Sequence, residues 1–216
     1  MSEKVFYFFQ LASTFSVVLP LSIGLWKLSK MDRKVKAFIF FLVLGLVTDL
    51  AGWYFYLSKD GTSNLYVRHI YDLIESVFLF WFLSWVSPSQ LVNKFFMWSI
   101  AILIPFWALR FLYLDAMGVY MSAVQVFVAF GACFSLIQMV ETKKEVTEHL
   151  IFWLLLGMFF YCFGTFFFMG ILISKLGKIW YAHNIINILS NLIFFNGFLR
   201  AKNLTGSHNT NLPPSQ

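Results

Sequence analysis

Residues 37–57 read AFIFFLVLGLVTDLAGWYFYL and contain a single charged side chain, Asp49. An α-helix rises about 1.5 Å per residue, so a helix of this length is about 30 Å long, which matches the hydrocarbon core of a lipid bilayer. Placing a stretch this apolar in water would leave it without a polar surface. Residues 37–57 therefore predict a transmembrane helix.

The composition of the whole chain agrees with this prediction. Of the 216 residues, 60% are apolar, 21% are aromatic and only 12% are charged. A soluble domain usually carries about twice that charged fraction, because its core needs a polar cover. The net charge of +6 does not indicate nucleic-acid binding, since the cations cluster between apolar runs, where they would face an anionic leaflet. We therefore expect the lipid bilayer, and no nucleic acid, as a partner.

Polar connections divide the chain into seven apolar runs, each about as long as one membrane span. The runs cover residues 5–28, 37–57, 66–87, 95–114, 119–140, 150–173 and 179–199. Pro20 and Pro105 are expected to kink the first and fourth runs. The sequence thus predicts an all-α bundle of seven transmembrane helices over residues 1–202. The polar residues 203–216 are expected to form a disordered tail.

Lysine and arginine are distributed unevenly between the two ends of the predicted spans. One end has ten of them: Lys27, Lys30, Arg33, Lys34, Lys36, Lys94, Lys143, Lys144, Arg200 and Lys202. The other end has four: Lys4, Lys59, Lys175 and Lys178. Because the cytoplasmic side of a membrane protein carries the excess of these cations, we expect the N-terminus outside and the tail in the cytoplasm.

Such a topology gives the first three and the last three spans the same orientations, as in a parallel three-plus-one-plus-three pseudo-repeat. Gly45 and Gly52 in the second span match Gly157 and Gly164 in the sixth span at an offset of 112. The polar residues of the third and seventh spans match at an offset of 114 or 115. Since the best offset shifts, a true repeat and convergent patterning both remain as explanations.

Polar side chains concentrate on the third and seventh spans. At 100° per residue, each set lies within an arc of about 120°. The first set is Arg68, His69, Asp72, Glu75 and Ser76, and the second is His183, Asn184, Asn187, Ser190 and Asn191. A carboxylate at the centre of a membrane helix costs about 2.5–3.5 kcal/mol, so these faces should avoid lipid. We expect the two faces to meet each other or to share a cavity.

Three interpretations of this polar cluster are open. The cluster can line a water-filled pocket that opens to the outside, or it can be a purely structural core in which Arg68 or Arg110 balances the carboxylates. The third interpretation is an intramembrane zinc hydrolase, for which His69, Asp72, Glu75 and His183 supply suitable ligand types. The HxxxH or HExxH spacing typical of such sites is absent from the sequence.

Two segments, YVRHIYDLIE at 66–75 and WYAHNIINI at 180–188, resemble a group of small seven-helix membrane proteins of unassigned function from Bacteroidota-type bacteria. The resemblance implies a multi-pass protein of the bacterial cytoplasmic (inner) membrane. It also points to His69, Tyr71, Glu75, His183 and Asn187, and it implies no activity. The similarity to the alkaline ceramidase and adiponectin-receptor superfamily ends where a second histidine is missing, because Asn187 stands four residues after His183.

The favoured interpretation is an outward-facing pocket that recognises a small molecule or a lipid, in a sensor or a carrier. The residues expected to line it are Asp49, Arg68, His69, Tyr71, Asp72, Glu75, Arg110, His183, Asn184, Asn187 and Asn191. This interpretation requires no cofactor, and zinc belongs to the hydrolase alternative. A sensor would need a separate signalling protein at the basic cytoplasmic loops, whereas a carrier would not.

Overall fold

A computed structural model describes residues 3–112, 117–143, 145–172 and 180–200 of the chain. Its α-helices are α1 (Glu3–Ser16), α2 (Val18–Trp26), α3 (Arg33–Leu57), α4 (Gly61–Val86), α5 (Gln90–Leu112), α6 (Met117–Thr142), α7 (Leu150–Leu172) and α8 (Trp180–Arg200). Short 3-10 turns, η1 (Leu28–Lys30) and η3 (Val146–Glu148), precede α3 and α7. The predicted all-α class is confirmed. The predicted tail, residues 203–216, lies outside the described residues.

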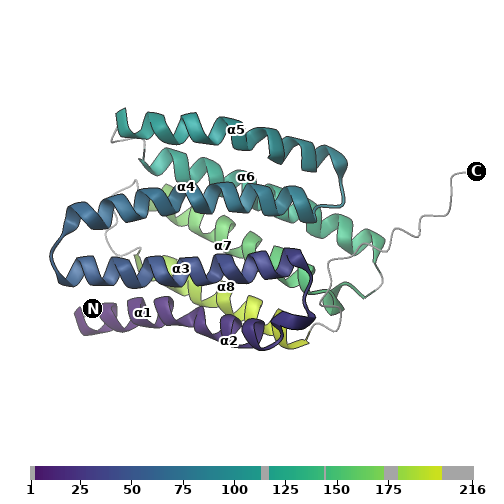
Figure 1. The fold of residues 1–216 in the computed structure, drawn as a ribbon, viewed down its shortest axis with the longest axis horizontal. Helices are drawn as coiled ribbons and strands as arrows, with labels where there is room; N and C mark the ends of the chain where they lie inside the picture. The colour runs from purple at the N-terminus through teal and green to yellow at the C-terminus, as the bar shows by residue number, and fades with distance from the viewer. Residues whose placement is uncertain (1–2, 113–116, 144, 173–179, 201–216) are drawn as a thin grey trace, which may run out of the picture.

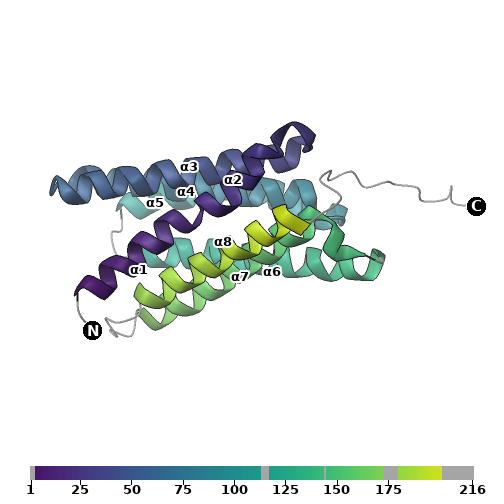
Figure 2. The ribbon, with the colours of Figure 1, turned by 90° about the horizontal axis from the view of Figure 1, so that it is seen from below.

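The helices pack side by side in one elongated bundle, and successive long helices run in opposite directions (Figure 1). α4 packs against α3, α5 and α6, while α7 lies between α6 and α8. α8 also packs against α1 and α2. Seen from below, α1 and α2 run obliquely from the side of α8 toward the side of α3 (Figure 2). The N-terminal helices therefore join the two halves of the bundle.

Six segments of the described residues are long and apolar enough to cross a membrane. They are Tyr7–Trp26, Arg33–Leu57, Gly61–Val86, Gln90–Leu109, Val119–Thr142 and Leu150–Phe167. The chain thus has the character of a multi-pass membrane protein. α8 is not among these segments, and its sequence, with four asparagines and a histidine, is more polar than theirs.

The helices α3 and α4 begin earlier than the sequence analysis predicts. α3 begins at Arg33 because the Asp32 side chain accepts a hydrogen bond from the backbone N–H of Val35, at 2.9 Å. α4 begins at Gly61, where the Asp60 side chain accepts from the N–H of Ser63, at 3.0 Å. A carboxylate at the N-cap satisfies an otherwise unpaired backbone donor. Polar residues that the sequence assigns to connections between spans therefore form the first turns of these two helices.

The first predicted span, residues 5–28, is not one continuous helix. α1 ends at Ser16 and α2 begins at Val18. Pro20 explains the break: it has no N–H to donate to the carbonyl of Ser16, four residues earlier, and its ring crowds that carbonyl. The ladder resumes at once, since the N–H of Leu21 donates to the carbonyl of Val17 at 3.2 Å. Pro105, by contrast, lies inside α5, which continues past it.

An aromatic cluster on α3, α4 and α8 forms the centre of the core. The ring of Phe38 lies 5.2 Å from that of Phe82 and 5.1 Å from that of Phe194, centroid to centroid. Phe78 stacks on Phe41 at 4.2 Å. These contacts fix α3 against α4 and bring α8 to the same place. The helices that carry the predicted polar faces are thereby held around one point.

Candidate functional site

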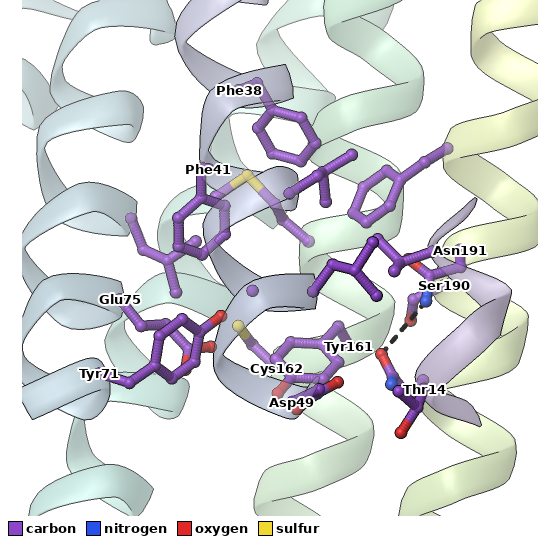
Figure 3. Close-up of a pocket in the computed structure, with 18 of the residues that line it drawn as sticks. Thr14, Phe38, Phe41, Asp49, Tyr71, Glu75, Tyr161, Cys162, Ser190 and Asn191 are labelled. Carbon is purple, nitrogen blue, oxygen red and sulfur yellow. Dashed lines mark hydrogen bonds between the residues drawn. The ribbon is translucent and has the colours of Figure 1, made fainter. Parts of the chain in front are cut away.

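A cavity of about 160 Å³ lies inside the bundle, among α1, α3, α4, α7 and α8 (Figure 3). Its lining mixes aromatic, aliphatic, acidic and amide side chains. The residues that line it are Thr14, Val17, Phe38, Phe41, Leu42, Gly45, Leu46, Asp49, Tyr71, Glu75, Leu79, Met158, Tyr161, Cys162, His183, Asn187, Ser190, Asn191 and Phe194. A mostly apolar cavity with a few convergent polar groups is the usual form of a small-molecule site.

The acidic side of the cavity is formed by α3 and α4. Glu75 is buried, with 7% of its surface exposed, and it lies beside Tyr71 one turn earlier on the same helix (Figure 3). Gly45 of α3 leaves room for the Tyr71 hydroxyl, because a Cβ at position 45 would stand 3.1 Å from that oxygen. Asp49 lines the cavity and is exposed at the same time. The cavity therefore reaches the protein surface beside Asp49.

The opposite side is a polar seam between α1 and α8. The Asn187 amide donates to the Ser13 hydroxyl at 2.9 Å, and the Asn191 amide donates to the Ser16 hydroxyl at 2.8 Å. The Thr14 hydroxyl accepts a hydrogen bond from the indole N–H of Trp53 on α3, at 3.2 Å. Hydrogen bonds of this kind hold helices together where water is absent. The seam fixes both asparagines at the edge of the cavity.

α7 and the start of α8 close the remaining side with Tyr161, Cys162 and His183. The rings of Tyr161 and His183 lie 6.3 Å apart, centroid to centroid. Among the described residues, the Nδ1 atom of His183 and the hydroxyl of Ser190 are buried and have no hydrogen-bond partner. A buried polar atom in this state costs free energy, so both atoms are suited to bind a guest or water in the cavity.

The cavity brings together six of the predicted pocket residues: Asp49, Tyr71, Glu75, His183, Asn187 and Asn191. Arg68, His69, Asp72 and Asn184 are not among the described residues that line it. Arg68 is exposed, whereas the other three are buried elsewhere in the bundle. The Arg110 side chain lies outside the described residues.

The polar face of α4 divides because a helix turns about 100° per residue. Asp72 lies within about 60° of His69, while Glu75 and Tyr71 lie about 120° and 160° around the helix from His69. The His69 carbonyl accepts a hydrogen bond from the Trp107 indole of α5, at 3.0 Å. The side of α4 that carries Glu75 and Tyr71 packs on α3 instead, as the stacking of Tyr71 near Phe41 shows. The polar residues of α4, predicted to form one face, are thus divided between the contact with α5 and the contact with α3.

The zinc alternative requires His69, Asp72, Glu75 and His183 to converge. Among the described residues, no group of three or more His, Cys, Asp or Glu side chains is placed to hold a metal ion. Only Glu75 and His183 of this set line the cavity, since His69 and Asp72 lie about 120° and 60° around α4 from Glu75. The predicted donor set is therefore not assembled in this structure.

Several residues of the cavity escape the sequence analysis. Tyr161 and Cys162 lie in α7, the most uniformly apolar helix, where nothing in the local sequence distinguishes them from packing residues. Ser13, Thr14 and Ser16 were recognisable, since three hydroxyls within four residues of an apolar run form a polar patch on one helix. The partners of Ser13 and Ser16 on α8, and that of Thr14 on α3, could not be assigned without the fold.

No protein-family model, curated protein or solved structure matches this chain. The side chains of the cavity are therefore the guide to what it can bind. Those side chains provide two carboxylates, an imidazole, two amides and an aromatic wall around a small space that reaches the protein surface.

Proposed function

We propose that this protein recognises a small molecule or a lipid head group in the cavity, as a sensor or as a carrier in a bacterial cytoplasmic membrane. One observation carries the proposal: polar residues that lie far apart in the sequence, on α3, α4 and α8, line the same cavity. Asp49 supports an outward opening, since it is exposed on α3 about 12 Å from the end that leads into α4. An exposed carboxylate at that depth is tolerated where water reaches it.

The proposed topology has seven spans, with α1 and α2 together as the first and α8 as the last. α8 is polar for a span, but its residues Asn187 and Asn191 face α1 and the cavity, where lipid does not reach them. The ends of α2, α4 and α8 and the starts of α3 and α5 lie at one end of the bundle (Figure 1). We assign this end, which carries the excess of lysine and arginine, to the cytoplasm.

Two cations at this end have a structural role as well. The Lys27 ammonium donates to the Phe198 carbonyl at 2.6 Å, and the Lys34 ammonium donates to the Trp85 carbonyl at 2.9 Å. Cations near the last carbonyls of a helix stabilise its C-terminus. Without these two, the eight other cations at this end still outnumber the four at the opposite end. The asymmetry therefore continues to favour a cytoplasmic tail.

Reporter fusions test this topology. A fusion at Lys202 is expected to report the cytoplasm, and a fusion at Lys59 is expected to report the exterior, because the cation excess lies at the end of Lys202. Alkaline phosphatase, active outside, and a fluorescent protein, active inside, provide complementary readouts at each position. The reverse pattern would place the mouth beside Asp49 on the cytoplasmic side and overturn the outward-facing assignment.

The pseudo-repeat also remains a proposal. Gly45 and Gly52 of α3 approach Tyr71 and Asn64 of α4 closely. In α7, Gly157 and Gly164 approach Phe194 and Ile186 of α8 in the same order. Close contacts at two glycines thus occur in both helix pairs. On α8, however, the contacted residues lie about two turns nearer the C-terminus than they would if the two pairs were related by the offset of the polar residues. These contacts favour a repeated helix pair over a repeat of the polar site.

Transport by the purified protein separates a carrier from a sensor. Proteoliposomes that contain only this protein are incubated with the total small-molecule extract of a bacterial culture, and the lumen is analysed by mass spectrometry. A carrier is expected to enrich a compound in the lumen. A sensor is expected to retain a compound on the protein without lumenal enrichment, because it acts through a separate signalling protein at the basic loops.

Liposomes with the Glu75→Gln protein are the matched control, since this change keeps the shape of the side chain and removes a carboxylate that lines the cavity. A compound that is enriched or retained equally by both proteins binds elsewhere. If neither accumulation nor retention depends on Glu75, the cavity is not a recognition site, and the proposal fails.

A further inference from the structure

We infer that the ligand of this cavity is a small organic cation, an amine or a quaternary ammonium group with an apolar body. This inference rests on the proposed function and specifies its ligand class. It comes from the charges that line the cavity, the aromatic groups between them and the size of the space.

The charged groups of the lining have one sign. Asp49 and Glu75 line the cavity, and no lysine or arginine is among the described residues of the lining. Arg68, one turn before Asp72 on α4, is the described cation closest in sequence to Glu75, and it is exposed. Its single positive charge offsets at most one of the two carboxylates. A guest with one positive charge is attracted by either carboxylate when it is ionised, whereas an anion would be repelled.

The apolar part of the lining is suited to a cation as well. Phe38, Phe41, Tyr71 and Tyr161 contribute aromatic rings (Figure 3). Phe194 of α8 adds a further ring to the lining, 5.1 Å from that of Phe38 between centroids. The faces of aromatic rings attract ammonium groups, an effect of about 0.5–2 kcal/mol that grows when water is removed. Cages of aromatic side chains are a common means by which proteins recognise quaternary ammonium ligands. An anionic or strongly hydrated guest gains nothing from these rings.

Neutral polar groups and the cavity size narrow the class further. The buried Nδ1 atom of His183 has no partner among the described residues, and the Asn187 side chain lies at the same edge. Both can form hydrogen bonds with a polar substituent of the guest. The volume of about 160 Å³ is below the roughly 300–1,000 Å³ of sites for drug-sized ligands. The cavity thus fits a head group or a small amine better than a large amphiphile.

Cys162 provides a direct test, because it is a buried thiol that lines the cavity. The chain has one other cysteine, Cys133 on α6, which Cys133→Ala removes. In detergent, the Cys133→Ala protein is treated with methanethiosulfonates that carry a trimethylammonium, a sulfonate or a neutral methyl group. Each reagent transfers its thiol portion to the Cys162 thiolate, which forms a disulfide and releases methanesulfinate. Each rate is divided by the rate of the same reagent with a free thiol in solution.

We expect the trimethylammonium reagent to modify Cys162 at least tenfold faster than the sulfonate reagent after this correction. The ratio does not depend on the ionisation of Cys162, since all reagents attack the same thiolate. Asp49→Asn and Glu75→Gln are each expected to lower the ratio severalfold, because each removes an acidic group from the lining. Cys133→Ala/Cys162→Ala protein gives the background.

The two proposals fail in different ways. If the neutral reagent reacts and the sulfonate reagent is as fast as the trimethylammonium reagent, the cavity is accessible and the cation inference is wrong. If no reagent reacts, even the neutral one, the cavity is closed, and the proposed function fails with the inference. The ratio of trimethylammonium to sulfonate modification in the Cys133→Ala protein is sufficient to test the cation inference, even if either carboxylate variant folds poorly.

Discussion

Replacing Glu75 with glutamine is expected to abolish ligand recognition while leaving the melting temperature in detergent almost unchanged. Glu75 lines the cavity, and glutamine keeps the shape of its side chain and much of its hydrogen-bonding capacity. Asp72, three residues earlier, is 6% exposed and is not among the residues that line the cavity. A buried carboxylate is retained only with partners, so Asp72→Asn is expected to lower the stability by about 1–3 kcal/mol.

The comparison separates a ligand pocket from a salt-bridged structural core. Melting curves of the two variants are measured beside the parent protein, together with the charge selectivity of Cys162 modification. In a structural core, loss of the Glu75 charge would leave a cation without its partner, and the cost would be about 3–5 kcal/mol. A larger loss of stability for Glu75→Gln than for Asp72→Asn would therefore contradict the pocket assignment.

Replacing Gly197 with alanine is expected to destabilise the bundle strongly. A Cβ at this position of α8 would stand 2.3 Å from the Cβ of Trp153 and 2.8 Å from its Cγ, atoms close to the α7 backbone that cannot rotate away. The indole of Trp153 is held further by its hydrogen bond to the Thr147 carbonyl, at 2.8 Å. Overpacking costs about 1–3 kcal/mol or more, and here it separates two helices that line the cavity.

Gly61→Ala is the matched control, because a Cβ at Gly61 meets nothing within 4 Å. Gly61 is the exposed first residue of α4. Alanine at such a position is neutral, or it stabilises the folded protein by about 0.4–1 kcal/mol because it reduces the conformational entropy of the unfolded chain. Thermal unfolding of the two purified proteins, followed by circular dichroism, measures the difference. Equal melting temperatures would show that α7 and α8 do not pack as closely as this structure places them.

The amino-acid sequence predicts the class of the fold well and the site in part. Polar residues in apolar helices must avoid lipid, which predicts a shared site for Asp49, Glu75, His183 and Asn187, and the structure places all four around one cavity. The same reasoning included Asp72, which lies on a neighbouring side of α4. A helical arc of about 120° is wide enough to contact two helices, so periodicity does not say which neighbour each residue meets.

The amino-acid sequence by itself determined that the chain is helical and suited to a membrane. That result follows from composition and length, since a run such as residues 37–57 matches the hydrocarbon core of a bilayer and is too apolar for water. The tertiary structure alone decided which side chains share the cavity. Tyr161 and Cys162 on α7 became lining residues because α7 packs between α6 and α8. The bonds from Ser13 and Ser16 to the asparagines of α8 join segments more than 170 residues apart, and contacts between such distant segments depend on packing that local sequence does not specify.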